Sequence, residues 1–136
     1  MGRRVSLAVV VDDDADIRHI MGRVLRRGGH QVVEAENGAV ALEAVFAHRP
    51  DVVVSDIDMP VMNGVELCQA IRAEPEFRQL PVVFVSGSLL IGDRRPAEGQ
   101  ATMLLAKPFG PPQLLSCVER ALADGHQDGQ APVLCR

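Results

Sequence analysis

Tryptophan and tyrosine are absent from this chain of 136 residues, and its aromatic residues are limited to four phenylalanines. No site in the protein can therefore offer a phenol or an indole. Long apolar runs are absent too, because none approaches the roughly 18 residues that a membrane-spanning helix needs. The first residues have neither the long apolar stretch nor the small-residue cleavage site of a signal peptide. The sequence thus predicts a protein without a membrane partner.

Positive charge is not in excess either. The 14 lysines and arginines are outnumbered by 18 aspartates and glutamates, which gives a formal net charge of −4. Because non-specific nucleic-acid binding needs a basic surface, no nucleic-acid partner is predicted. The content of 47% hydrophobic and 24% charged residues is typical of a soluble globular protein. The length fits one domain with a full core.

Cysteine and histidine show no pattern that carries chemistry. The three cysteines, Cys68, Cys117 and Cys135, are odd in number, and their spacing matches no metal or redox motif. Cys68 and Cys117 fall in expected helices, where a buried thiol packs as a small hydrophobic group. The four histidines are scattered without ligand spacing. These observations predict no metal site of the Cys/His type, and a reducing cytoplasm as the location.

Short apolar runs alternate with amphipathic stretches along the chain. The apolar runs predict strands at 7–11, 31–35, 51–55, 81–85 and 102–106. Apolar residues at helical spacing predict helices at 14–27, 39–47, 65–73 and 111–123. This alternation is typical of an α/β fold in which a doubly wound, five-stranded parallel sheet is covered on both faces.

Two segments fit this pattern poorly. The stretch 86–100 contains three glycines and a proline, so we expect a fourth helix of only one or two turns, short or irregular. From Gly125 onward the chain is polar and rich in glycine, so we expect it to fray. The predicted organisation is one domain over residues 5–123, followed by a flexible C-terminal tail over 124–136.

Acidic residues follow two of the predicted strands at the point where each strand ends. Asp12, Asp13 and Asp14 come directly after a run of valines, and Asp56 comes two residues after another. Because the carboxyl ends of parallel strands share one edge of the sheet, which is where such folds bind ligands, we expect these acids to converge. Carboxylates this close are costly unless a cation or a proton intervenes. The acids therefore predict a site.

The residue types at this edge indicate phosphoryl chemistry on a magnesium ion. Clustered carboxylates without histidine or thiol partners suit Mg²⁺, which takes one or two carboxylates and phosphate oxygens. Ser86 and Lys107 lie at the ends of two later strands. Their hydroxyl and ammonium groups suit a phosphoryl group. A remaining carboxylate can act as the nucleophile that accepts it.

In this order and spacing, the motifs resemble the receiver domain of two-component response regulators. The resemblance covers about residues 5–123 and implies the chemotaxis-regulator-like, flavodoxin-like strand order 2-1-3-4-5. The matching motifs are Val10-Val11-Asp12-Asp13, Ile17-Arg18, Asp56, Met59-Pro60, Asn63-Gly64, Pro81-Val82, Ser86 and Lys107-Pro108-Phe109.

The resemblance implies a metal site and a phosphoacceptor. Asp56 would accept a phosphoryl group from a sensor histidine kinase, a phosphotransfer protein or a small phosphodonor. Asp13 and Asp56 would bind Mg²⁺ directly, with the backbone carbonyl of Asp58 as a third ligand. Asp12 would act through a bound water. Asp14 is expected only to start a helix, since acids suit that position, while the role of the Asp58 side chain stays open.

The resemblance also implies a switch. Ser86 would be the hydroxyl that turns toward the phosphoryl group, and Lys107 the ion-pair partner of Asp56 and then of the phosphate. The Lys107–Pro108 peptide bond is expected to be cis. Phosphorylation would change the surface around residues 86–107 for a downstream protein that the sequence does not name. The protein would promote its own phosphorylation and slow dephosphorylation without being an enzyme.

The sequence departs from the family pattern on the surface that the family uses for output. Leu104 stands three residues before Lys107, where the family usually carries tyrosine or phenylalanine. The segment from Gly92 to Gly99 reads poorly as a fourth helix. We therefore expect intact phosphorylation chemistry with altered output coupling.

Other functions remain open at this point. Asp56-Ile57-Asp58 also resembles the acid pair of haloacid-dehalogenase-type phosphatases, although Pro60 replaces the threonine or valine expected there. A receiver-like interaction domain that works without phosphorylation is a further alternative. The chain would be a stand-alone receiver or a receiver cut from a larger protein, and its oligomeric state is open.

Overall fold

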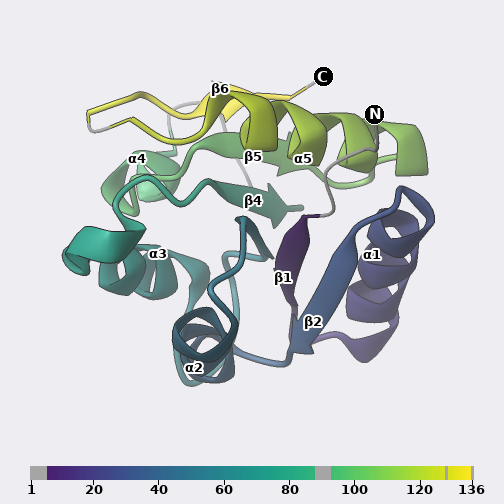
Figure 1. Cartoon of the computed structure of the whole chain (residues 1–136), viewed down its shortest axis with the longest axis horizontal. Helices are drawn as coiled ribbons and strands as arrows, with labels where there is room; N and C mark the ends of the chain where they lie inside the picture. Colours follow the sequence, from purple (N-terminus) through teal and green to yellow (C-terminus); the bar gives the residue numbers. More distant parts are fainter. Residues whose placement is uncertain (1–5, 88–92, 128, 136) are drawn as a thin grey trace.

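Six parallel strands form one sheet in the order β2-β1-β3-β4-β5-β6 in this computed structural model (Figure 1). The structure describes residues 6–87, 93–127 and 129–135. The first five strands confirm the predicted strands and the predicted order. The strands are β1 (Leu7–Val11), β2 (Gln31–Ala35), β3 (Val52–Ser55), β4 (Val82–Ser86), β5 (Met103–Ala106) and β6 (Val133–Leu134).

Helices cover both faces of the sheet, as a doubly wound fold requires. Alternate residues of β1 point to opposite faces, so Val9 and Val11 pack in one apolar layer while Ala8 and Val10 pack in the other. Helices α2 and α3 contribute to the first layer, and α1 and α5 to the second. The helices are α1 (Ala15–Arg27), α2 (Gly38–His48), α3 (Gly64–Ala73), α4 (Arg95–Glu98) and α5 (Pro111–Asp124), with a short 3₁₀ helix, η1 (Pro75–Phe77).

Helix α4 has a single turn, which confirms the prediction of a short fourth helix. Gly99 follows it, and a Cβ at that position would lie 3.2 Å from the ring of the buried Phe84. The chain passes close to the core here because residue 99 has no side chain. Residues 88–92, which include Gly92 of the predicted irregular segment, lie outside the described part of the chain.

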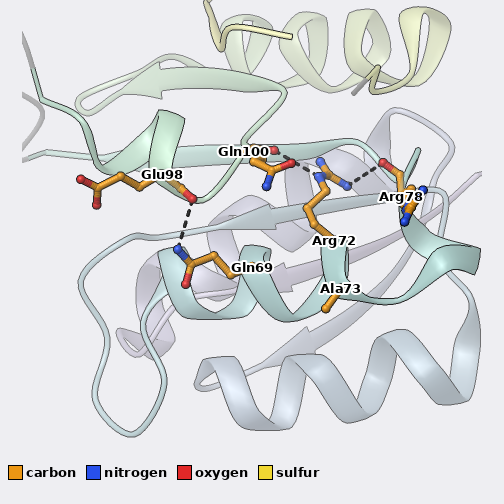
Figure 2. Close-up of a pocket in the computed structure, with 6 residues that line it drawn as sticks. All are labelled: Gln69, Arg72, Ala73, Arg78, Glu98 and Gln100. Carbon is orange, nitrogen blue, oxygen red and sulfur yellow. Dashed lines mark hydrogen bonds between the residues drawn. The ribbon is translucent and has the colours of Figure 1, made fainter. Parts of the chain in front are cut away.

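A buried arginine in α3 joins three parts of the fold. Arg72 is 7% exposed and donates hydrogen bonds to the carbonyl oxygens of Leu80 (2.6 Å) and Gln100 (3.1 Å). Figure 2 shows its guanidinium reaching from α3 toward the Arg78 and Gln100 backbones. The carbonyls of Leu80 and Gln100 precede β4 and β5, so Arg72 fixes the points where both strands enter the sheet.

The C-terminal residues correct two expectations. Val133–Leu134 form β6 and pair in parallel with β5, although the tail was expected to fray. Cys117 and Cys135 form a disulfide with 5.9 Å between their Cα atoms, although Cys117 was expected to be a buried thiol that packs as a small hydrophobic group. The sequence could not show this pairing, because it depends on a chain reversal after Gly125 that returns the tail to α5. The prediction of a reducing compartment from unpaired cysteines therefore loses its basis.

Cys68 is the free cysteine of the described chain, and it is buried as predicted. Burial raises the pKa of its thiol to about 12, so the thiol stays protonated. In the described part of the chain, no helix combines the length and the apolar character needed to cross a membrane.

Candidate functional site

Three carboxylates converge at the carboxyl edge of the sheet, as the strand-end pattern predicted. Asp12 and Asp13 follow β1, and Asp56 follows the adjacent strand β3, whose Ser55 pairs with Val11. One oxygen from each carboxylate lies within 4.8 Å of the others. All possible ligand atoms of this group are oxygens, which is the donor set that hard divalent cations prefer.

The turn from β1 to α1 holds its acids in different positions. Asp12 is 1% exposed, and one of its carboxylate oxygens accepts a hydrogen bond from the backbone of Asp14 (2.9 Å). The Asp14 carboxylate accepts from the backbone N–H groups of Asp16 and Ile17 and so caps α1. The prediction that Asp14 starts the helix is confirmed. The backbone of the turn thus fixes the Asp12 carboxylate, while Asp13 is exposed to solvent.

Arg18 adds a support that the sequence motif did not explain. Its guanidinium donates a 2.8 Å hydrogen bond to the backbone carbonyl of Asp12 and lies 3.5 Å from the Glu34 carboxylate. Arg18 therefore ties α1 to the end of β1 and to β2. A cation beside the acidic turn also offsets part of its negative charge. The position of Arg18 six residues after Asp12, on the first turns of the helix, is the signal that could have predicted this contact.

Lys107 brings a positive charge between two of the carboxylates. Its ammonium lies 3.3 Å from Asp12 Oδ2 and 3.6 Å from Asp56 Oδ2. The sequence predicted Asp56 as its partner, and the structure adds Asp12 as the nearer one. The backbone N–H of Lys107 donates to the carbonyl of Ser86 (3.0 Å), so β4 positions the lysine. The Lys107–Pro108 bond is cis, as predicted.

The carboxyl group of Asp56 has a raised pKa. Burial is the main cause, Asp12 adds to the rise, and Lys107 opposes it. One carboxylate oxygen of Asp56 accepts a 2.7 Å hydrogen bond from the backbone N–H of Ile57, which fixes the side-chain direction. The negative charge of Asp56 is therefore incompletely compensated by the protein alone, and a further cation at this edge would favour the ionised form.

Gly64 lies against the backbone of the candidate phosphoacceptor. Its N–H donates to the carbonyl of Ile57 (2.8 Å). A Cβ at residue 64 would overlap the carbonyl oxygen of Asp56 and would lie 2.9 Å from the Cα of Ile57. Glycine is therefore required here because two backbone segments approach closely, which explains the Asn63-Gly64 motif at the start of α3.

Replacing Gly64 by alanine is expected to lower the free energy of unfolding by about 1–3 kcal/mol, because the added methyl group forces the loop after β3 away from α3. Urea unfolding would measure this change. Gly87→Ala is the matched control, since a Cβ there meets its nearest atom, in Lys107, at an ordinary 3.7 Å. Equal stability of the Gly64 variant and the natural protein would contradict the close approach.

Asp58 and Ser86 lie at the same edge in different settings. The Asp58 carboxylate is exposed and forms a 2.8 Å ion pair with Arg95, the first residue of α4. Arg95 also pairs with Asp93 at 2.8 Å. The sequence assigned no role to Arg95. No local pattern could have predicted its pairing with Asp58, because the two residues are 37 positions apart. Ser86 ends β4 and is 1% exposed.

Leu104 fills the position where an aromatic ring was expected from the resemblance. It lies opposite Phe84 in the pairing of β4 with β5, and its half-buried side chain packs against the apolar layer that contains Phe84. An aliphatic side chain thus continues the core beside Phe84. The ring at this point of the sheet belongs to Phe84, one strand away.

Comparisons with known proteins agree with this geometry. A profile of the response regulator receiver domain family matches residues 8–119. The transcriptional regulatory protein PrrA of Mycobacterium tuberculosis is 38% identical over 115 residues, which are 84% of this chain and 48% of PrrA. The chain thus spans about half the length of this curated relative.

Solved structures share the fold over most of the chain. A putative response regulator from Chloroflexus aurantiacus has a TM-score of 0.83 at 30% identity, covering 88% of this chain and 99% of that one. The receiver domain of the sensor histidine kinase PA1611 from Pseudomonas aeruginosa, solved with a magnesium ion in its active site cleft, has a TM-score of 0.82. The match covers 89% of this chain and 100% of the PA1611 domain. At 24% identity, it supports the fold alone. With the family profile covering most of its length, the chain belongs to the response regulator receiver domain family.

Proposed function

We propose that this protein is a phosphorylation-dependent signalling receiver in which Asp56 accepts a phosphoryl group. The observation that carries the proposal is the position of the Lys107 ammonium, 3.6 Å from Asp56 and 3.3 Å from Asp12, in a cluster that also includes Asp13. A phosphoryl group on Asp56 would find a cation already beside it. Receiver domains act in signalling and are not enzymes in the usual sense.

Mg²⁺ is the proposed cofactor. Asp13 and Asp56 would bind it directly, the backbone carbonyl of Asp58 would be a third ligand, and Asp12 would act through a water. The support is the all-oxygen donor set at the sheet edge. The PA1611 receiver domain, which shares this fold, was solved with a magnesium ion in its active site cleft, which is consistent with a metal site in this protein. The metal would supply positive charge for the transferred phosphoryl oxygens.

The chain's own residues would divide the transfer step among them. A carboxylate oxygen of Asp56 would attack the phosphorus of a phosphohistidine, the P–N bond would break, and an acyl phosphate would form on Asp56. Lys107 would then pair with a phosphoryl oxygen. The Ser86 hydroxyl would donate to a second phosphoryl oxygen, which would shift the end of β4. Hydrolysis of the acyl phosphate would return the site to its starting state.

The proposed partners follow from this chemistry. A sensor histidine kinase or a phosphotransfer protein would supply the phosphoryl group, and the protein would then act in the cytoplasm. The surface around residues 86–107 would carry the output to a downstream protein. Arg95 gives this surface a direct link to the site, because it connects the start of α4 to Asp58. Nucleic acid and membrane are not proposed as partners.

Incubation with acetyl phosphate and Mg²⁺, followed by intact mass spectrometry, tests the proposal. The natural protein is expected to gain one phosphoryl group, and Asp56→Asn none, because an amide is not a nucleophile of this kind. Asp58→Asn is the matched control, since its carboxylate faces Arg95 and only its backbone carbonyl is assigned to the site. It is expected to keep the single phosphorylation.

Other results would replace the proposal. Equal phosphorylation of the natural protein and Asp56→Asn would move the phosphoacceptor to another residue. No phosphoryl gain on the natural protein would favour an interaction domain that works without phosphorylation. Steady release of phosphate from many phosphomonoesters would favour the phosphatase alternative.

A further inference from the structure

The C-terminal segment returns to the sheet and covers the outer edge of β5. This returning segment runs from His126 to Cys135, and the structure describes it apart from residue 128. The backbone N–H of Val133 donates to Thr102 (3.0 Å), and that of Cys135 donates to Leu104 (2.7 Å). Figure 1 shows β6 lying beside β5. Two carbonyls on this edge of β5 are therefore satisfied by the chain's own tail.

The returning segment is anchored at both ends. At its start, the His126 side chain is 2% exposed, and its Nδ1 lies 2.9 Å from the hydroxyl of Thr102. At its end, Cys135 is joined to Cys117 of α5 by the disulfide, and its sulfur lies 3.8 Å from that of Met103. The disulfide thus attaches the end of the segment to the helix that packs over β5.

Little else holds the second anchor. Strand β6 has two residues, and a strand this short adds little stability by itself. Leu134 is 52% exposed, and Val133 is half-buried. Gly125 and Gly129 both have positive φ angles and open space around them, so the connection to β6 is not packed at these points. The disulfide is therefore the main restraint on the end of the segment.

The covered edge is close to the switch residues of the site. Leu104, whose carbonyl accepts from Cys135, lies opposite Phe84 of β4 and three residues before Lys107. The unpaired edge of a strand is a place where an extended segment of another protein can pair. In its present position, the returning segment blocks this pairing along β5.

We propose that the Cys117–Cys135 disulfide is a redox-controlled latch that keeps the β5 edge covered until it is reduced. A thiolate of a dithiol reductant attacks Sγ of Cys135, which is half-buried, whereas Cys117 is 2% exposed. The S–S bond breaks, Cys117 leaves as a thiolate that takes up a proton, and a mixed disulfide forms on Cys135. The second thiol of the reductant resolves it, so two electrons and two protons reach the protein and the reductant becomes a disulfide. Exchange with a small disulfide reverses the reaction.

The proposed location and the burial of the third cysteine both fit a reversible disulfide better than a permanent structural one. Disulfides in reducing compartments are mostly transient or redox-sensing, and the proposed function, on which this step rests, would put the protein in such a compartment. The remaining thiol cannot compete in the exchange, because Cys68 is buried in the opposite apolar layer from Cys117. The latch does not require phosphorylation of Asp56, so its test is separate from the one for the phosphoacceptor.

Thiol counting establishes the starting state of the full chain. After exposure to a small disulfide, alkylation under denaturing conditions and intact mass spectrometry are expected to find one free thiol, that of Cys68. After treatment with dithiothreitol, all cysteines are expected to be alkylated. Three alkylated cysteines without reductant would overturn the proposal.

Hydrogen exchange then tests release. Peptides covering residues 126–135 are expected to exchange roughly 100-fold faster in the reduced protein, because the loop closed by the disulfide is lost. Peptides from β1 and β3 are expected to be unchanged, which shows that the fold persists. Cys135→Ser should behave like the reduced protein without any reductant, and Cys68→Ala, the control, like the oxidised protein. Equal exchange of residues 126–135 in both redox states would sink the latch. Phosphorylation by acetyl phosphate, measured on both forms, reports on Asp56 independently.

Discussion

Asp13→Asn is expected to weaken Mg²⁺ binding by about 100-fold, since the loss of outer-shell groups alone often costs 10–100-fold in metal affinity. Asp13 is proposed as a direct ligand because its carboxylate lies within 4.8 Å of those of Asp12 and Asp56 and is exposed to solvent. An amide keeps one oxygen but loses the negative charge that attracts the cation. Calorimetric titration with Mg²⁺ would measure the affinity. The rate of phosphorylation by acetyl phosphate at limiting Mg²⁺ should fall with it.

Asp14→Asn separates metal binding from a general loss of negative charge. The two residues are adjacent, but the Asp14 carboxylate accepts from the backbone of Asp16 and Ile17. Asparagine caps helices about as well as aspartate, so α1 should keep its start. We expect the Asp14 variant to bind Mg²⁺ within about threefold of the natural protein, because a screened neighbouring charge contributes little. Equal losses in the two variants would mean that Asp13 acts only through its charge.

Arg72→Ala is expected to lower the free energy of unfolding by about 2–4 kcal/mol, because each buried carbonyl acceptor that loses its donor costs about 1–3 kcal/mol. The guanidinium donates to the buried carbonyl of Leu80 and to the partly buried carbonyl of Gln100, and Figure 2 shows the second of these contacts. Both acceptors lose this donor in the variant. Such groups are costly to leave unsatisfied. Urea unfolding, followed by circular dichroism, would measure the change.

Arg78→Ala is the matched control for this prediction. Arg78 and Arg72 line one pocket beside α3, but the Arg78 side chain is exposed, and only its backbone carbonyl accepts from Arg72. Its replacement is expected to change stability by less than about 0.5 kcal/mol. Arg72→Lys should fall between the two, because an ammonium cannot reproduce the fork geometry of a guanidinium. A natural-like stability of Arg72→Ala would contradict a structural role for this network.

Much of the site could be predicted because its residues follow strands that are apolar throughout. The valine runs before Asp12 and Asp56 are completely buried in β1 and β3. Parallel strands end at one edge, so the convergence of their acids followed from topology alone. The short fourth helix was predictable from glycine and proline content in the same way. The catalytic and metal-binding roles stay predictions, since the structure places the residues without testing what they do.

Contacts between distant side chains could not be predicted. Helical periodicity places residue 72 at the edge of the buried face of α3, but it does not indicate an arginine or its partners. Those partners lie in η1 and just before β5. The pair of Arg95 with Asp58 joins residues 37 apart. Neither the Arg72 hydrogen bonds nor the Arg95–Asp58 ion pair is marked by a local sequence pattern, because both form only when the helices pack on the sheet.

The sequence by itself determined the α/β class and the gathering of carboxylates with Lys107, because hydrophobic periodicity and the rules of parallel sheets act locally and uniformly. The order of the first five strands came from the resemblance of its motifs to the receiver family. The tertiary structure alone decided that Lys107 lies nearer to Asp12 than to Asp56 and that Cys117 pairs with Cys135. A disulfide depends on the distance between two Cα atoms in the folded chain. That distance was set here by how a polar, glycine-rich tail turns back onto β5, a long-range event that no local pattern encodes.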